Sequence, residues 1–398
     1  MSIPDITLCD FVKSTDQWEG LDRMNLITTE VEQKNLTEWE LLALDSHLNL
    51  SDGHPRQALT TAQSAIIAQL PEIFAQVGRD HPAEVERRAV RQYMTMVRQV
   101  SFPSDRVLLC YASSVAMEIL ARAIAIESNR CALLHPTFDN IPDLLRGNGL
   151  ELVPVAEDVY ETGRIDADIL GAVGCVFLTT PNNPTGRVLG ERQLANIAAQ
   201  CREHGVILAL DTCFRSFDER AQYDHYRVLE ESGCRWVVIE DTGKIWPMHE
   251  LKVGMLIHSE NIGPNLAKIH SDILLAVSPV IMQMVERLAI DAVNGGIDDL
   301  HAHIAQNREI VHQELRTVPG ISYPFSDNMI SVEVVDLGHR YAEQVWNELR
   351  ARSVYLLPCE AFYWNAPERG AHQLRIALSR DPERVRWAMQ VLAEVLTQ

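Results

Sequence analysis

The sequence predicts an α/β protein in which a large domain with a mostly parallel sheet is followed by a smaller α+β domain. From about residue 60 to 290, short and nearly all-apolar runs alternate with helical stretches, as in βαβ units whose sheet is buried on both faces. After Asn294-Gly295-Gly296 the pattern changes to an α+β mixture. The length of 398 residues suffices for two or three domains of roughly 150 residues each.

The first regular element is a short helix preceded by an arm. Residues 1–34 show no hydrophobic period, and we expect them to form a mobile arm. Thr37 as N-cap with Glu40 three residues later forms a capping box, and Leu36 and Leu41 are spaced as a hydrophobic staple. This pattern predicts a helix that runs to about Leu48. Residues 49–55 then form a loop rich in turn-forming residues.

The strands and helices that follow define the domain boundaries. Six apolar runs predict strands at residues 131–134, 152–155, 174–179, 206–210, 236–239 and 253–257. Helical patterns lie at residues 114–126, 190–204 and about 262–294, the last of which ends at the Asn-Gly-Gly sequence. Beyond it, strands are predicted near 321–334 and 373–378, and a closing helix at 382–396. The predicted parts are an arm with a lid helix (1–60), a large domain (61–293) and a small domain (294–398).

Composition and charge exclude several classes of protein. Hydrophobic residues make up 46% and charged residues 23% of the chain, which is globular usage and excludes disorder as the main state. The net charge, 35 − 55 = −20, disfavours binding to nucleic acids or anionic membranes. The N-terminus has no signal-peptide pattern, and no apolar run approaches the roughly 18 residues of a membrane span. Eight separated cysteines without a C-x-x-C motif predict reduced thiols and a soluble cytoplasmic protein. The histidines lack metal-ligand spacing, so no metal is expected.

Polar segments follow several predicted strands in a fixed order. Singly, each is also typical of a turn or of a solvated strand end. Together, groups at the carboxyl ends of consecutive parallel strands predict one ligand crevice. These segments are residues 179–186 (TTPNNPTG), 210–214 (LDTCF), 241–244 (DTGK), 251–254 (LKVG) and 374–378 (LRIAL).

This ordered set resembles the aspartate-aminotransferase superfamily, the class I/II pyridoxal-phosphate enzymes of fold type I, from about Thr37 to the C-terminus. The resemblance implies that pyridoxal 5′-phosphate is the cofactor and that Lys244 forms its Schiff base and then shuttles the substrate α-proton. It also implies that Asp211 faces the pyridine nitrogen, that Asn183 contacts the ring oxygen and the substrate, and that Arg375 holds the substrate carboxylate with a bidentate fork.

The resemblance extends to the cofactor phosphate and ring. It assigns the phosphate to the hydroxyl groups and backbone of Ser113 and Ser114 at a helix start, together with Thr242 and Lys252. Lys252 departs from the superfamily, in which arginine is usual at this position. A lysine still offers the phosphate a positive charge, but it lacks the bidentate fork of arginine. Phe138 matches the aromatic residue that stacks on the ring. A helix cap at Ser113 and a core aromatic at Phe138 remain alternatives.

A second departure lies at Phe214. Most of the superfamily has a tyrosine three residues after the pyridine-facing aspartate, and that tyrosine donates to the cofactor's ring oxygen. Phenylalanine cannot donate a hydrogen bond. The departure argues against an ordinary transaminase.

Several segments are similar to one subgroup, the oxygen- and pyridoxal-phosphate-dependent arginine oxidases and hydroxylases of antibiotic pathways such as enduracididine and indolmycin biosynthesis. The resemblance implies a homodimeric enzyme that uses dioxygen, without metal or flavin, to convert L-arginine to 4-hydroxy-2-ketoarginine, ammonia and hydrogen peroxide. A desaturating arginine oxidase and an ordinary aminotransferase remain alternatives. A regulator with an aminotransferase-like domain would need a DNA-binding module, and no basic helix-turn-helix region is visible. The segments are residues 35–40, 52–54, 135–141, 143–150 and 239–247.

The subgroup resemblance also implies where the substrate binds. A guanidinium group binds carboxylates well, and Glu40, Asp52 and Asp241 lie in matching segments. Thr37 lies there too, although for Thr37 and Glu40 the helix-capping interpretation competes with substrate binding. His54 is expected to control water or protons at the active-site mouth.

Overall fold

The computed structural model describes residues 36–43, 46–248, 251–263 and 266–398. The predicted arm, residues 1–34, lies outside the described residues. Residues from Asn35 to Gln398 form one compact unit. The predicted division of this unit at residues 60 and 294 stays a prediction. In the part of the chain that the structure describes, no helix combines the length and the apolar character needed to cross a bilayer.

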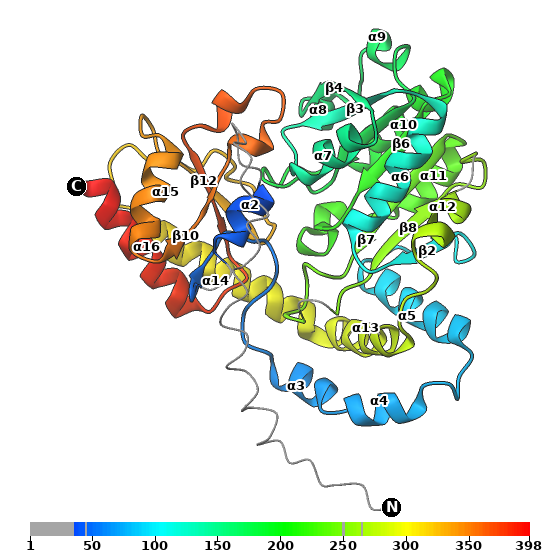
Figure 1. Ribbon diagram of the computed structural model, residues 1–398, viewed down its shortest axis with the longest axis horizontal. Helices are drawn as coiled ribbons and strands as arrows, with labels where there is room; N and C mark the ends of the chain where they lie inside the picture. The colour runs from blue at the N-terminus through cyan, green and yellow to red at the C-terminus, as the bar shows by residue number, and fades with distance from the viewer. Residues whose placement is uncertain (1–35, 44–45, 249–250, 264–265) are drawn as a thin grey trace, which may run out of the picture. The chain divides into compact units, whose positions relative to one another are not determined.

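A seven-stranded sheet forms the centre of this unit (Figure 1). Its strand order is β2-β8-β7-β6-β5-β3-β4, and all neighbouring pairs are parallel except those that β8 makes with β7 and β2. All six predicted strands of this region are present within one or two residues. The sequence pattern missed β2 and the reversal of β8. The strands are β2 (Val107–Cys110), β3 (Arg130–His135), β4 (Glu151–Ala156), β5 (Cys175–Thr179), β6 (Ile207–Asp211), β7 (Arg235–Asp241) and β8 (Gly254–His258).

Alternate residues of the central strands face two separate hydrophobic clusters, as a strand's side-chain period of two requires. In β3, Ala132 and Leu134 belong to one cluster, while Cys131 and Leu133 belong to the other. The first cluster includes α5 (Pro82–Met96), α10 (Glu191–His204), α11 (His225–Ser232) and α13 (Pro279–Asp291). The second includes α6 (Ser113–Glu127), α7 (Asn140–Gly147) and α12 (Leu266–Ile273). The sheet is therefore covered on both faces, as predicted.

A smaller antiparallel sheet follows in the C-terminal part of the chain. Its order is β11-β12-β9, and it packs with two helices. The predicted strand at 373–378 and the closing helix at 382–396 are confirmed. Of the predicted strand at 321–334, the structure contains β9 and one isolated bridge at Ser322. The elements are β9 (Val332–Asp336), α15 (Ala342–Ala351), β11 (Leu357–Pro358), β12 (Gln373–Ala377) and α16 (Pro382–Thr397).

The long helix predicted at 262–294 is wrong in its middle and at its C-terminal end. The segment contains α12 and α13, which are separate helices. The chain does not leave the helix at the Asn-Gly-Gly sequence, but kinks there and continues as α14 (Ile297–Leu315). Asn294 and Gly295 have non-helical backbone angles, and Gly295 has a φ of 120°, which glycine adopts without strain. In Figure 1, the yellow run of α13 and α14 passes from the large sheet to the three-stranded sheet.

The predicted N-terminal helix is shorter than expected. Helix α2 (Leu36–Leu41) ends well before Leu48. The chain then forms β1 (Leu48–Asn49), which pairs with β10 (Val354–Tyr355). Leu36 is buried, but Leu41 is 50% exposed, so the two do not form the predicted staple. The helix begins at Leu36, which places Thr37 inside it rather than at the N-cap.

The remaining elements are short helical segments. They are α3 (Thr61–Ile67), α4 (Leu70–Gln76), α8 (Val159–Thr162), α9 (Ala167–Leu170), η2 (Arg215–Phe217), η3 (Glu219–Ala221), η4 (Ala292–Gly296), η5 (Glu360–Phe362) and η6 (Pro367–Gly370).

Candidate active site

A cavity of about 250 Å³ contains most of the predicted site residues. Eleven of the fourteen line it. The lining residues are Glu40, Gly53, His54, Ala112, Ser113, Ser114, Met117, Phe138, Asn140, Asn183, Asp211, Cys213, Phe214, Asp241, Lys244, Lys252 and Arg375.

The strand register explains why residues distant in sequence meet here. Thr179 ends β5 opposite Asp211, and Asp211 ends β6 opposite Ile239. Asp241 ends β7, and Lys244 follows three residues later. Because these strands are parallel, their carboxyl ends and the segments that follow lie at one edge of the sheet.

Asp211 is a buried carboxylate at the base of the cavity. Its Oδ1 accepts the backbone N–H of Cys213 at 3.0 Å. Burial raises the pKa of Asp211, and the nearby carboxylate of Asp241 adds to the increase, while hydrogen bonding with Cys213 opposes it. A carboxylate in this setting is stabilised by a cationic N–H donor.

The start of α6 forms another wall of the cavity. Ser113 and Ser114 open this 15-residue helix, whose first N–H groups and dipole favour anions. Gly254 lets the start of α6 lie close to β8, because a Cβ at position 254 would lie 2.3 Å from the carbonyl carbon of Ala112. The Asp241 carboxylate accepts the N–H of Ser113 at 2.8 Å and also that of Gly243. The turn that leads to Lys244 is thereby tied to the helix start.

Two lysines and a histidine also line the cavity, and the lysines carry the charge opposite to that of these carboxylates. The Nε2 of His54 is 3.2 Å from the Nζ of Lys252. The charge of Lys244 lowers the pKa of His54, and burial and the charge of Lys252 lower it further, against the opposing effect of Asp52. These effects together favour the neutral form of His54. A Cβ on the adjacent Gly53 would lie 3.9 Å from the Nζ of Lys244, so this loop passes close to the amine.

Arg375 and Glu40 form an ion pair at the end of the cavity nearest α2. The Nη2 of Arg375 lies 3.5 Å from Oε1 of Glu40 and also donates to the carbonyl of Ser51. Its Nη1 donates to Oδ1 of Asn183 at 3.3 Å. Arg375 is fully buried, and its Nε donates to none of the described residues. Burial raises the pKa of Glu40, and the charge of Arg375 opposes that increase. An anionic ligand at Arg375 would therefore compete with Glu40.

Three predicted site residues do not line the cavity. The carboxylate of Asp52 lies 2.8 Å from Arg56 and 3.4 Å from Arg380, so it anchors its own loop. Thr242 accepts the N–H of Val253 at 2.8 Å and so fixes β8 beside β7. The side chain of Thr37 lies outside the described residues. Substrate or cofactor binding by these three residues stays a prediction.

Sequence reasoning did not single out five residues that line the cavity: Gly53, Ala112, Met117, Asn140 and Cys213. Each lies within two positions of a predicted site residue, except Met117, which lies one helical turn after Ser113. Position next to a strand end or helix start was therefore the signal available for most of them.

The donor set fits pyridoxal 5′-phosphate, by the chemistry of the residues present. Asp211 would hold the ring nitrogen, and Phe138 would stack on the ring. Ser113, Ser114 and Lys252 would hold the phosphate, and Lys244 supplies the amine that joins the cofactor covalently.

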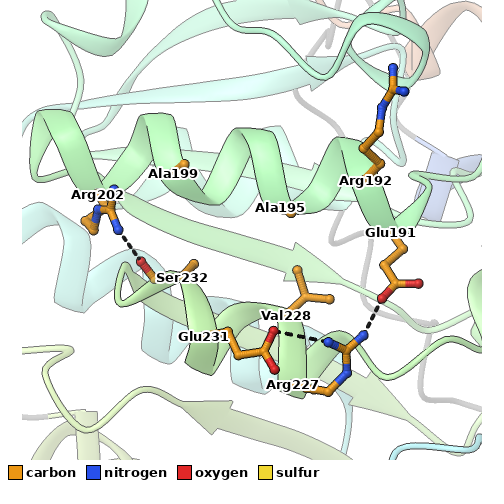
Figure 2. Close-up of a pocket in the computed structure, with 9 residues that line it drawn as sticks. All are labelled: Glu191, Arg192, Ala195, Ala199, Arg202, Arg227, Val228, Glu231 and Ser232. Atoms are coloured by element: carbon orange, nitrogen blue, oxygen red, sulfur yellow. Dashed lines mark hydrogen bonds and ion pairs between the residues drawn. The ribbon is translucent and has the colours of Figure 1, made fainter.

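A second hollow lies on the outer surface between α10 and α11 (Figure 2). Most of its charged groups already have partners: Arg227 pairs with Glu191 and with Glu231, and Arg202 donates to the carbonyl of Ser232. None of the predicted site residues lies there. The hollow therefore offers no competing active site.

Comparisons with sequences of known proteins identify related enzymes. The model of the family described as aminotransferase class I and II matches residues 45–392. A probable N-acetyl-LL-diaminopimelate aminotransferase of Bacillus subtilis is 24% identical over 220 residues, which are 54% of this chain and 54% of that protein. The match thus spans about half of that relative. Histidinol-phosphate aminotransferase 1 of Nitrosococcus oceani is 24% identical over 312 residues, 75% of this chain and 77% of that protein.

Solved structures give a closer match. The structure of MppP soaked with the product 2-ketoarginine is 51% identical, with a TM-score of 0.86, over 87% of this chain and 99% of that chain. Aspartate aminotransferase from Thermus thermophilus with maleate is 17% identical, with a TM-score of 0.75, over 92% of this chain and 97% of that chain. The second likeness concerns the fold alone, which is the predicted aspartate-aminotransferase-like fold.

Proposed function

We propose, from the premise that this chain belongs to the aminotransferase class I and II family, that it catalyses the dioxygen-dependent oxidation of L-arginine. As an enzyme of this fold superfamily it uses pyridoxal 5′-phosphate. The observation that carries the finer proposal is the 51% identity to MppP, whose structure was soaked with 2-ketoarginine. The curated relatives at 24% identity are aminotransferases of other substrates.

The cavity supports an α-amino acid with a cationic side chain as substrate. Arg375 offers a fork for the α-carboxylate, with its Nε still available and its Nη1 near Asn183. Glu40, released from Arg375 by that carboxylate, offers an anion for a guanidinium group. Asp241 is a second anion that lines the cavity. A bidentate pair with a carboxylate selects arginine over lysine, which lacks the fork.

The residues divide the chemistry among them. Pyridoxal phosphate, when bound, supplies the electron sink that makes the substrate's α-hydrogen acidic. Lys244 takes the α-proton, since its amine lines the cavity beside Gly53. Asp211 keeps a proton on the ring nitrogen. His54, neutral between two lysines, is able to hold or move a proton or orient a water.

The complete reaction is 4-hydroxylation with oxidative deamination. Atom balance requires two molecules of dioxygen and two of water for each arginine, and yields 4-hydroxy-2-ketoarginine, ammonia and two molecules of hydrogen peroxide. We also propose that the enzyme is a cytoplasmic homodimer that serves the biosynthesis of an antibiotic or a non-proteinogenic amino acid. A 4,5-desaturating arginine oxidase and an ordinary aminotransferase are the alternatives.

Incubation of the holoenzyme with L-arginine, with and without oxygen, tests the proposal. We expect keto acid, ammonia and peroxide in air without any added keto acid, and a hydroxylated product by mass spectrometry. In H₂¹⁸O the 4-hydroxyl should carry the label, since water supplies that oxygen. Product formation that requires an amino acceptor and is indifferent to oxygen would identify an aminotransferase. An unsaturated product in air would identify the desaturating oxidase.

A further inference from the structure

Asp139 joins the cavity wall to the N-terminal helix. It lies between Phe138 and Asn140, which both line the cavity. Its own Oδ2 accepts the backbone N–H of Leu36, the first residue of α2, at 2.5 Å. The two residues are 103 positions apart, and Asp139 is only 4% exposed. The contact is therefore a buried tertiary link rather than a local helix cap.

Helix α2 depends on such links for its position. A helix of six residues is unstable by itself. Leu36 and Trp39 pack into a small cluster with Trp346 and Phe362, in which the rings of Trp39 and Trp346 are 4.3 Å apart. The other face of the helix is open, since Leu41 and Leu42 are exposed. The Leu36 end is thus fixed by packing together with one hydrogen bond to Asp139.

We propose that Asp139 is a positioning residue that docks helix α2 and thereby sets Glu40 opposite Arg375 for recognition of the substrate's cationic end. Glu40 lies one helical turn after Leu36, so displacement of the helix start moves the carboxylate. The substrate part of this inference rests on the proposed function. The docking part does not.

The proton on Asp139 governs how well it docks the helix. Its Oδ1 is buried and accepts no hydrogen bond from the described residues. Burial raises the pKa of Asp139 to about 7. Asp143 on α7 and Glu40 on α2 add to the increase, while the N–H of Leu36 and the charge of Arg375 on β12 oppose it. With a proton on Oδ1, Oδ2 still accepts from Leu36, and no charge is buried. When α2 is displaced, water reaches the carboxyl and its pKa falls toward the ordinary value. Proton uptake therefore favours the docked helix, and docking weakens as the pH rises from about 4 to about 7, above which the carboxyl is ionised in both states.

Hydrogen exchange of the backbone in residues 36–43, read by mass spectrometry on the holoenzyme, tests the inference. Asp139→Ala should lower protection roughly tenfold or more, since it removes a buried hydrogen bond. Asp139→Asn keeps an acceptor without a charge, so it should retain protection and lose the decline between about pH 4 and 7. Any pH dependence left in Asp139→Asn belongs to Glu40. Asp168→Ala, which removes an exposed carboxylate on α9, is the control and should leave protection unchanged.

Kinetics provide the second measurement. We expect Asp139→Ala to raise the KM for L-arginine roughly tenfold with kcat changed less than twofold, and the absorbance of the bound cofactor to stay the same. Asp139→Asn should restore the wild-type KM. Unchanged protection in Asp139→Ala, or equal loss in both variants, would overturn the inference. If arginine is not oxidised at all, the proposed function fails while the exchange result still decides the docking role.

Discussion

Lys244 is the amine that lines the cavity beside Gly53 and the strand-end carboxylates. We expect Lys244→Ala to abolish turnover and the visible absorbance of the Schiff base, while cofactor still binds through the other residues. Borohydride reduction followed by peptide mapping should label Lys244 in the wild-type protein. Lys268, which pairs with Asp272 on the surface, is the control for replacement of a lysine. A label on any other lysine would show that the assignment is wrong.

Phe214 lines the cavity and packs against Phe217, with ring centroids 6.0 Å apart. A tyrosine at position 214 would donate a hydrogen bond to the cofactor's ring oxygen, an interaction of roughly 1.5–3 kcal/mol. This hydrogen bond would withdraw electron density from the cofactor ring. We expect Phe214→Tyr to slow oxygen consumption by one to two powers of ten and to increase half-transamination. Stopped-flow absorbance with arginine in aerated buffer measures how fast the absorbance of the substrate-bound cofactor decays as it reacts with oxygen. Phe217→Tyr controls for a buried hydroxyl group, and an unchanged rate in Phe214→Tyr would leave Phe214 as a packing residue.

Glu40 exchanges its partner Arg375 for the substrate in the proposed complex. We expect Glu40→Gln to raise the KM for L-arginine by about ten- to a hundredfold, because a charge-assisted contact of roughly 1.5–3 kcal/mol becomes a neutral one. Steady-state kinetics with arginine measures this loss. Glu38→Gln on the same helix should change KM little. A KM that rises equally in both variants would indicate damage to the helix rather than loss of a substrate contact.

Residues at strand ends were predictable, and residues with distant partners were not. Asp211, Lys244 and Asn183 follow buried strands, and parallel strands bring such positions together whatever the loops do. Asp52 lies in a loop whose partner, Arg380, is 328 positions away. Its nearby partner Arg56 is visible in the sequence, but no local pattern shows that the buried Arg380 also pairs with this carboxylate. The link between Asp139 and Leu36 was missed for the same reason.

At the scale of elements, helix α2 supplies Glu40 to the lining of the cavity. We expect deletion of residues 1–34 to change arginine oxidation little, and deletion through Glu40 to reduce it sharply. The longer deletion removes most of α2 and with it Glu40, the partner of Arg375 that lines the cavity, so we expect water to enter there. Oxygen uptake with arginine by the two truncated proteins measures the difference. Equal activity in both would contradict a covering role for this helix.

Buried strands were the best predicted elements, because both of their faces are covered and their sequences are almost entirely apolar. Val107 and Leu108 of β2 are only half-buried, so this edge strand lacked that signal. The reversal of β8 depends on its pairing with β2 and β7, which no local pattern encodes. The end predicted for the long helix was wrong because Gly295 accommodates a kink, after which the helix resumes.

At the scale of the whole molecule, Asp52 links the pH to the stability of the fold. Burial favours its neutral form, but the hydrogen bond with His54 and the charges of Arg380 and Arg56 outweigh burial and lower its pKa. Below the unfolded-state pKa of about 3.9, the unfolded chain takes up a proton that the folded chain does not. The stability that Asp52 contributes is therefore complete above about pH 4 and is lost as the pH falls further.

Urea unfolding of Asp52→Asn measures this contribution. We expect the free energy of unfolding to fall by about 3–5 kcal/mol at pH 6, because Arg380 is left buried without its anion. The difference from the wild-type protein should shrink below pH 4. Asp80→Asn, which removes an exposed partner of Arg88, should change stability by less than about 1 kcal/mol. A difference that stays constant down to pH 2 would contradict the linkage.

The contact between Gly254 and the start of α6 constrains how this sequence is able to change over generations. The hydrogen of Gly254 occupies the place where a methyl group would overlap Ala112 and the N–H of Ser113. A new side chain there would push the helix start, and with it the anion-binding N–H groups, away from β8. Selection for cofactor binding would thus act on Gly254, although this residue does not line the cavity. Inheritance of the glycine is expected to follow that of the serines, although they lie on different elements.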